Sequence, residues 1–342
     1  MKKYLLDFNE FQFKAAIADL ISQDYRIEQI MRWVYVKKAS SFEQFSNLPK
    51  EIRQSLDAGF SLRTLSILKK ETSKIDGSIR YLFKTQDKKS FFAVFLPSRD
   101  TNSVCISSQV GCPVGCSFCA SGKIKYVRNL SRGEIIEQIL QIENDTNQKV
   151  GGVLFMGMGE PMFNYNSVAS ALNSLLSRKE FYMGKRHITL STIGIVPAIK
   201  KLADENLGIR LAVSLHSCDD KQRSKMIPSV KFSIEEILNS AKYYLKKTNS
   251  RLTIEYILIK NFNDTSADAR KLARLLEKHS LINPKTQVNL IPYNHTKSSS
   301  FLPSTPQSIE KFKTILKLNS VLSNIRQAKG ADISAACGQL GY

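Results

Sequence analysis

The fold of this chain is decided by the stretch Cys112-Pro113-Val114-Gly115-Cys116-Ser117-Phe118-Cys119, which places three thiols in one short segment with the spacing CxxxCxxC. Thiolates are soft ligands that favour zinc, copper(I) and iron–sulfur clusters. Structural zinc sites usually take four protein ligands, often as two distant pairs, but the other cysteines, Cys105, Cys218 and Cys337, stand alone. The spacing therefore favours an iron–sulfur cluster over zinc, with one iron left open for another ligand.

This spacing resembles that of the radical S-adenosylmethionine superfamily. The resemblance implies that the open iron binds the methionine end of the cofactor, and that one electron from the cluster releases a 5′-deoxyadenosyl radical. The cofactor carries that step, while the protein binds, orients and shields it. A protein that binds RNA through a zinc-stapled loop, without catalysis, is the alternative from another functional class.

The composition points to a polyanionic partner. The 342 residues contain 50 Lys and Arg against 30 Asp and Glu, a formal net charge of +20. Such an excess attracts nucleic acid, whose phosphates dominate its affinity for proteins, although a solvated lysine-rich surface also explains it. A hydrophobic content of 42% suffices for a core, and no apolar run is long enough to span a bilayer. Asp7 and Glu10 interrupt any signal peptide, so we expect a cytoplasmic protein with reduced cysteines.

The hydrophobic pattern divides the chain into three parts. Residues 1–75 are expected to form an N-terminal helical accessory domain, because apolar residues recur at helical spacing through 8–75. Residues 76–100 read as a β-hairpin extension that turns at Gln86-Asp87-Lys88. Residues 101–342 alternate strands and helices, which predicts an α/β fold: a partial (β/α) barrel whose site lies at the carboxyl ends of the strands.

The predicted strands and helices of this last part follow one another regularly. We predict strands at Val104–Ser108, Val150–Met156, His187–Ser191, Ile209–His216, Leu252–Ile259, Gln287–Pro292 and Asn324–Ala328. Helices are predicted at Ser131–Asn144, Val168–Ser177, Pro197–Glu205, Ile234–Lys247, Ala267–Lys278 and Thr305–Asn319.

Several of these strands end in residues suited to bind a ligand. The second ends in Met156-Gly157-Met158-Gly159-Glu160-Pro161, where small residues let the backbone approach a ligand, unless this is an ordinary glycine turn. Ser191-Thr192 and Ser214-Leu215-His216 end the next two, and Asn294 follows the last barrel strand. A lone histidine such as His216 is more often structural than functional. Their shared position at strand ends is the stronger signal.

These segments together resemble a narrower family. Cys105-Ile106-Ser107-Ser108-Gln109-Val110-Gly111-Cys112, the MGMGEP segment, Leu190-Ser191-Thr192, the SLH segment and Ala335-Ala336-Cys337-Gly338-Gln339-Leu340 occur in this order. This set is similar to the RlmN/Cfr family of radical S-adenosylmethionine 23S ribosomal RNA (adenine) methyltransferases, and the likeness covers nearly the whole chain. It implies a radical SAM core barrel with a helical accessory domain and a C-terminal catalytic tail.

The resemblance also implies roles for individual residues. Cys112, Cys116 and Cys119 would hold a [4Fe-4S] cluster. S-adenosylmethionine, two molecules per turnover, would be bound by Gly159, Glu160, Ser191, Ser214, Leu215, His216 and Asn294. Cys337 would accept a methyl group, whose carbon would become a radical and form a bridge to RNA. Cys105 would then break this bridge by forming a disulfide with Cys337. Without the family, Cys337 reads as a small buried hydrophobe and Cys105 as a strand core residue; Cys218 has no matching role.

The implied substrate is an adenosine of 23S ribosomal RNA, methylated at carbon 2, with the adenosine beside the tRNA anticodon as a second target. Methylation at carbon 8, which confers antibiotic resistance in the Cfr branch, stays open: Pro161 favours carbon 2, whereas Ser191-Thr192-Ile193-Gly194 is closer to Cfr. The family carries a glutamate proton acceptor where this chain has Phe92, and phenylalanine cannot take a proton. Either another group or water removes the ring proton, or this chain acts on a different substrate. A flavodoxin-like one-electron donor and a monomeric state are also expected.

Overall fold

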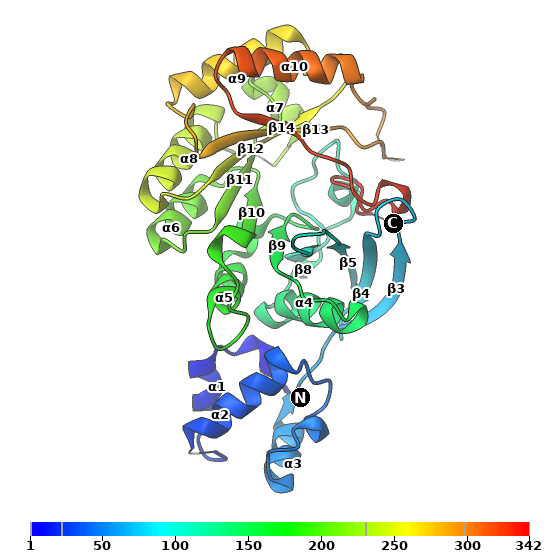
Figure 1. Cartoon of the computed structure of the whole chain (residues 1–342), viewed down its shortest axis with the longest axis vertical. Coiled ribbons are helices and arrows are strands. Elements are labelled where there is room, and N and C mark those ends of the chain that lie inside the picture. Colours follow the sequence, from blue (N-terminus) through cyan, green and yellow to red (C-terminus); the bar gives the residue numbers. More distant parts are fainter. Residues whose placement is uncertain (1, 22, 230, 297–298, 342) are drawn as a thin grey trace.

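The computed structural model describes residues 2–21, 23–229, 231–296 and 299–341. A ten-stranded sheet forms its centre, in the order β14-β13-β12-β11-β10-β9-β6-β5-β4-β3, and its two edges, β14 and β3, do not pair with each other (Figure 1). The parallel strands are β6 Ser103–Cys105, β9 Gly152–Phe155, β10 Ile188–Thr192, β11 Arg210–Ser214, β12 Leu252–Leu258, β13 Thr286–Pro292 and β14 Ser323–Ile325. An incomplete barrel of this kind confirms the predicted fold class.

A helix follows each parallel strand except the last, as the sequence predicts. These helices are α4 Arg132–Thr146, α5 Tyr165–Leu176, α6 Val196–Glu205, α8 Ile234–Thr248, α9 Ser266–Lys278 and α10 Pro306–Leu318, with the short α7 Asp220–Met226 preceding α8. Capping boxes at Ser131 and Ser233 fix where α4 and α8 begin, because each serine side chain and the glutamate three residues later satisfy exposed backbone N–H groups. Among the described residues, no helix has the length and apolar content needed to cross a membrane.

An antiparallel extension continues the sheet beyond β6. It consists of β3 Ser66–Thr72, β4 Ile79–Lys84 and β5 Ser90–Leu96. The predicted turn at 86–88 is confirmed, with Lys88 at a φ of 61°. The prediction that 8–75 is helical throughout is wrong for Ser66–Thr72. This edge strand is mostly exposed and carries lysines that mask its alternation, so its pairing with β4 decides its conformation.

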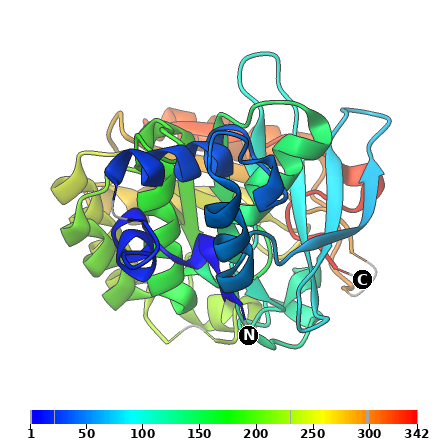
Figure 2. The same ribbon diagram turned by 90° about the horizontal axis from the view of Figure 1, so that it is seen from below.

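The N-terminal helices pack below α4 and α5 (Figure 1), and Figure 2 shows them in front of the barrel. They are α1 Glu10–Ala16, α2 Asp24–Met31 and α3 Lys50–Gly59, with a π-helical turn at Arg32–Val36 and a parallel pair of short strands, β1 Lys3–Tyr4 and β2 Phe60–Ser61. Three apolar residues of α2 are buried, as their helical spacing predicts: Ile27, Ile30 and Met31. Leu20, which lies between α1 and α2, is exposed.

Buried polar groups of α4 anchor this N-terminal part. The guanidinium of Arg132 donates to the carboxylate of Glu180 at 2.6 Å and to the carbonyl of Leu6, and both charged side chains are at most 5% exposed. One turn on, the Glu137 carboxylate accepts from the backbone N–H groups of Thr64 and Leu65 at 2.9 and 3.2 Å. The helix that follows the cysteine loop therefore also positions the accessory helices.

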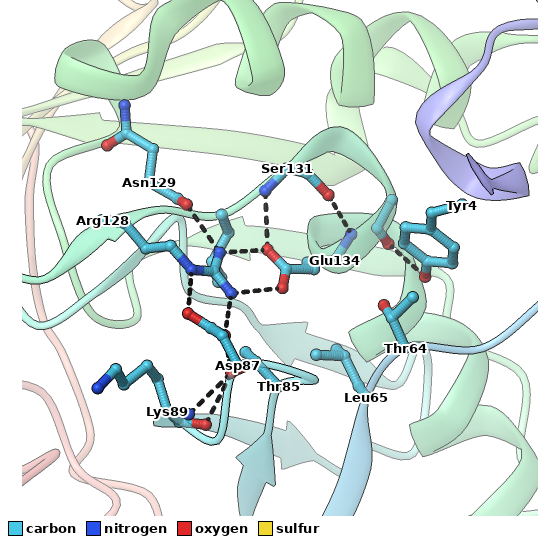
Figure 3. A network of polar contacts seen from close by, with 12 residues as sticks. Tyr4, Thr64, Leu65, Thr85, Asp87, Lys89, Arg128, Asn129, Ser131 and Glu134 are labelled. Carbon is cyan, nitrogen blue, oxygen red and sulfur yellow. Dashed lines mark hydrogen bonds and ion pairs between the residues drawn. The ribbon is translucent and has the colours of Figure 1, made fainter. Parts of the chain in front are cut away.

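A charged network holds the antiparallel extension against the segment that follows the cysteine loop (Figure 3). Arg128, in β8 Arg128–Asn129, donates to both carboxylate oxygens of Asp87 at 2.9 and 2.7 Å. It also donates to both oxygens of Glu134 at 2.7 and 2.8 Å, and Glu134 caps α4. The Arg128 guanidinium holds the pKa of the Asp87 carboxyl well below its usual range. β8 in turn pairs with β7 Gln109–Val110, just ahead of the cysteine loop.

The C-terminal tail runs from β14 across to the antiparallel extension (Figure 1). The N–H of Gly330 donates to Asp76 at 2.8 Å, and Asp332 accepts from the N–H of Lys74 at 3.1 Å. Further along, the carbonyl of Gly338 accepts from the N–H of Ala120 at 2.7 Å. These bonds bring the end of the chain beside the cysteine loop.

Candidate active site

The cysteine loop is held from its backbone. The N–H of Cys112 donates to the carbonyl of Ile124 at 3.2 Å, and the N–H of Ser117 donates to the carbonyl of Met226 at 2.9 Å. Ser229 adds a hydroxyl bond to the carbonyl of Val114 at 2.6 Å. Gly111 has a φ of +74°, and a Cβ there would lie 2.1 Å from a backbone oxygen, so only glycine fits at the entry of the loop.

Cys112, Cys116 and Cys119 line one cavity at the carboxyl ends of the parallel strands. Burial raises the pKa of the Cys112 thiol to about 11, and it also raises the pKa values of Cys116 and Cys119. Among the described residues, no three His, Cys, Asp or Glu side chains are grouped closely enough to hold a metal ion. The thiols thus border a shared space rather than one point, and three thiolates facing a common space are a donor set that fits a [4Fe-4S] cluster.

The segment after β9 forms another wall of this cavity. A Cβ on Gly157 would lie 2.7 Å from the carbonyl carbon of Ile106, and Gly159 has a φ of +99° with Gln109 packed against it. The Glu160 carboxylate accepts from the N–H groups of Met162 and Ile193 at 2.9 and 2.8 Å. Burial raises the pKa of Glu160 to about 7, against the lowering effect of these bonds. Gly159 and Glu160 thus lie where the sequence predicts a ligand.

Ser191, Ser214 and His216 also line the cavity. His216 is buried with a φ of 63°, and its Nδ1 accepts from the N–H of Ile257 at 3.1 Å. Burial lowers its pKa to about 3, so the ring is neutral at physiological pH. Its edge packs against Phe118 of the cysteine loop, with 4.9 Å between ring centroids. His216 therefore has a structural role beside its place in the cavity wall.

Two of the predicted cofactor residues lie elsewhere. Leu215 is fully buried and does not line the cavity; its carbonyl accepts from the guanidinium of Arg223 at 2.9 Å. Asn294 does not line it either, and its amide donates to the carbonyl of Cys337 at 3.0 Å. In the structure, Asn294 therefore fastens the tail that carries Cys337.

Cys337 joins this cavity to a second one. It lines both, whereas Cys105, at the end of β6, lines only the second. Burial raises the pKa of the Cys105 thiol to about 12; a negative charge on Cys337 adds to this, while Arg326 opposes it. Two cysteines more than 200 positions apart thus line the same second cavity, which Cys119 of the cysteine loop also borders.

Phe92 lies outside both cavities. It lines a separate pocket with Glu71 and Arg80, and the guanidinium of Arg80 lies 5.1 Å from the centroid of its ring. Its carbonyl accepts from the hydroxyl of Ser107 at 2.5 Å.

Sequence reasoning missed three charged residues in and behind the cavity wall, of which Glu255 and Arg223 are buried and Arg326 is half-buried. Glu255, on β12, and Arg326, just after β14, line the cavity, and Arg326 lines the second cavity as well. Arg223, in α7, is fully buried and donates to the carbonyls of Ile193, Leu215 and Ser214. A charged residue inside or directly after a predicted strand was the available signal, since such residues are rarely buried unless they are paired.

The comparisons with known proteins agree with this arrangement. The model of the radical SAM superfamily matches residues 106–276, and that of the ribosomal RNA large subunit methyltransferase N-terminal domain matches residues 3–61. A protein of Endomicrobium trichonymphae named probable dual-specificity RNA methyltransferase RlmN is 64% identical over all of this chain and 98% of its own length. This chain belongs to the RlmN/Cfr family.

Two further relatives support the assignment to the RlmN/Cfr family. A protein of the same name from Thermotoga petrophila is 44% identical over 99% of this chain and 97% of its own length. The crystal structure of a radical SAM methyltransferase from Sphaerobacter thermophilus superposes with a TM-score of 0.93 at 35% identity and covers 99% of both chains. As a family member, this chain is a radical SAM RNA methyltransferase that uses S-adenosylmethionine and a [4Fe-4S] cluster. The zinc-stapled alternative is therefore not favoured.

Proposed function

We propose that this enzyme methylates carbon 2 of an adenosine in 23S ribosomal RNA and of the adenosine beside the anticodon of transfer RNA. The position of Cys337, in the walls of both cavities, carries the proposal. A residue in this position can take a methyl group from the cofactor in the first cavity and react with Cys105 in the second. The relatives named dual-specificity RNA methyltransferase RlmN support carbon 2 and the two RNA targets over the carbon 8 alternative.

Cys112, Cys116 and Cys119 would hold the cluster, and the walls formed by Gly159, Glu160, Ser191, Ser214 and His216 would hold S-adenosylmethionine. When bound, the cluster and S-adenosylmethionine would use one electron from an external donor to supply a radical that abstracts a hydrogen atom. The buried polar wall excludes water, which protects a radical from side reactions. Leu215 and Asn294 would act through backbone position and tail anchoring.

The Cys337 thiolate would attack the methyl carbon of one S-adenosylmethionine, so that its S–C bond forms as the sulfonium bond breaks and S-adenosylhomocysteine leaves. A radical derived from a second molecule would then remove a hydrogen atom from this methyl group and leave a carbon radical bonded to the Cys337 sulfur. That carbon would add to the ring carbon of adenine, one electron would return to the cluster, and loss of the ring proton to a base would restore the aromatic ring. The Cys105 thiolate then attacks the Cys337 sulfur, because the thiolate is the attacking form. The S–C electron pair goes to carbon, which leaves a methylene group on the ring and a Cys105–Cys337 disulfide.

Arg326 gives this sequence of steps an electrostatic basis. Its charge lowers the pKa of Cys105, whereas a charged Cys337 raises it. Burial raises this pKa most. A methylated Cys337 carries no charge, so its contribution is then lost, while the effects of burial and of Arg326 remain. The Cys105 thiolate is therefore less unfavourable once Cys337 carries the methyl group.

The test is mass spectrometry of ribosomal and transfer RNA lacking the modification, after anaerobic incubation with reconstituted enzyme, S-adenosylmethionine and a reductant. We expect 2-methyladenosine in both RNAs. Methylation at carbon 8 alone, or none in either RNA, would contradict the proposal. Cys337→Ala, which keeps the cluster ligands, is the matched control and should give no product.

A further inference from the structure

The proposed reaction needs a group that accepts a proton. The ring carbon carries a hydrogen at the start and a methyl group at the end, so that hydrogen must leave as a proton. A base that takes it has to reach the substrate within the cavity. Phe92 has no basic group and lies in another pocket. A different side chain must therefore serve.

Two carboxylates line the cavity among the described residues, and one of them is already committed. Both oxygens of Glu160 accept backbone N–H groups, Oε1 from Met162 and Oε2 from Ile193. Protonating Glu160 would weaken bonds that shape the cavity wall. Glu160 is therefore better suited to fix that wall than to take a proton from the substrate.

Glu255 is the other carboxylate. It is 3% exposed, and its Oε1 accepts from the amide of Asn289 at 3.0 Å and lies 3.7 Å from Nη1 of Arg326. Its Oε2 is buried and has no hydrogen-bond partner among the described atoms. A buried acceptor without a partner costs free energy, and such a group in a cavity wall marks a place where a ligand supplies the missing contact.

Arg326 forms an ion pair with Glu255 and lines both cavities. Its Nη1 also lies 3.3 Å from Sδ of Met156, at the rim of both cavities. Burial raises the pKa of Glu255, while Arg326 and Asn289 oppose this. A raised pKa makes the ionised carboxylate a stronger proton acceptor than an exposed one, as suits a general base.

We propose that Glu255 accepts the proton of the ring carbon and that Arg326 is its positioning residue. The inference rests on the proposed function, because it concerns the adduct between methylated Cys337 and the adenine ring. In this step the C–H bond of the ring carbon breaks, and its electron pair restores the aromatic ring. Oε2 takes the proton, and after disulfide formation one proton from the carboxylic acid or from water reaches the methylene carbon to complete the methyl group. Electrons and net charge are conserved.

The experiment compares reconstituted holoenzymes carrying Glu255→Gln or Glu71→Gln. Glu71 is the matched control, because it is a carboxylate that lines the separate pocket of Phe92. RNA with hydrogen or deuterium at carbon 2 of adenine is the substrate. Methylation of Cys337, RNA methylation and the deuterium isotope effect are measured by mass spectrometry. Positioned bases contribute roughly 10²–10⁴-fold, so Glu255→Gln should slow RNA methylation by roughly 10²-fold or more and enlarge the isotope effect.

Methylation of Cys337 should stay at the wild-type level in Glu255→Gln, because that half-reaction does not use the base. RNA methylation that falls with a larger isotope effect, while Cys337 methylation persists, is a pattern that a merely structural role of Glu255 would not give. Wild-type rates and isotope effect in Glu255→Gln, the same loss in Glu71→Gln, or an equal loss of Cys337 methylation would each overturn the inference.

If Glu255→Gln does not retain the cluster, Glu255→Asp serves instead. It keeps the carboxylate but withdraws it from the substrate, so RNA methylation should slow and the isotope effect should grow. An unchanged rate and isotope effect in Glu255→Asp would overturn the inference. Failure of the proposed function looks different, because the wild-type enzyme itself would then methylate RNA at carbon 8 alone or not at all.

Discussion

The buried ion pair between Arg132 and Glu180 should control how firmly the accessory helices are held. The two side chains are 4% and 5% exposed, and 2.6 Å separates Nη2 from Oε2. Glu180→Ala leaves the guanidinium buried without its counter-charge. Removing one partner of such a pair costs roughly 3–5 kcal/mol, or roughly a hundred- to several-thousand-fold in the unfolding equilibrium.

Trp33 provides the assay, because it is the only tryptophan in the chain and stacks on Phe45 within the accessory part. With an m-value of roughly 1–3 kcal/mol/M, the urea midpoint of its fluorescence should fall by an amount on the order of 1–5 M. The visible absorbance of the cluster reports the barrel separately, and its midpoint should move less.

Lys179→Ala is the matched control. Lys179 precedes Glu180 in the chain, and its ammonium forms a 2.7 Å ion pair with Glu10 of α1. The Lys179 side chain is, however, 52% exposed. Exposed pairs contribute about 0–1 kcal/mol, so the Trp33 midpoint should barely change. Replacing both partners, as Arg132→Met with Glu180→Leu, should cost less than Glu180→Ala alone. A Glu180→Ala midpoint equal to that of Lys179→Ala would refute this reasoning.

Three further outcomes follow from the site. Cys105→Ala should accumulate protein covalently bound to RNA on a denaturing gel, sensitive to ribonuclease, whereas the double variant with Cys337→Ala should show none; an RNA-free Cys105→Ala protein would contradict the role of Cys105. Anaerobically prepared protein should be brown with about four irons per chain, and Cys116→Ala should be colourless; stoichiometric zinc in the wild type would contradict the cluster. Alkylation of Cys105 should be slow at neutral pH and accelerate towards pH 12, because burial raises its pKa to about 12. The pH dependence of the alkylation rate should move to lower pH in Cys337→Ala and to higher pH in Arg326→Met. The contribution of the protonated Cys105 thiol to folding stability should be present below about pH 9 and lost as the pH rises towards 12. Rapid alkylation at neutral pH would contradict this burial.

The barrel was predictable because each strand and helix carries its own period, and the cysteine loop follows the first strand of that alternation. Ser66–Thr72 could not be predicted in the same way, since its strand conformation depends on pairing with β4. The cysteine triplet and the ends of β9 to β11 identify the cavity from sequence alone. Nothing local in the sequence, however, indicates that Arg326 and Glu255 meet across two strands, or that Asn294 binds the tail. Those contacts arise from long-range packing, which a linear pattern does not encode.

The central claim, that the methyl group reaches RNA through a carbon radical on Cys337, is tested most directly with S-adenosylmethionine that carries a trideuterated methyl group. Hydrogen abstraction from the methylated Cys337 removes one deuterium before the carbon joins the ring. Mass spectrometry of digested RNA should therefore show a methyl group with two deuteriums, together with deuterium in 5′-deoxyadenosine. A product methyl group that keeps all three deuteriums would show direct transfer and contradict the account.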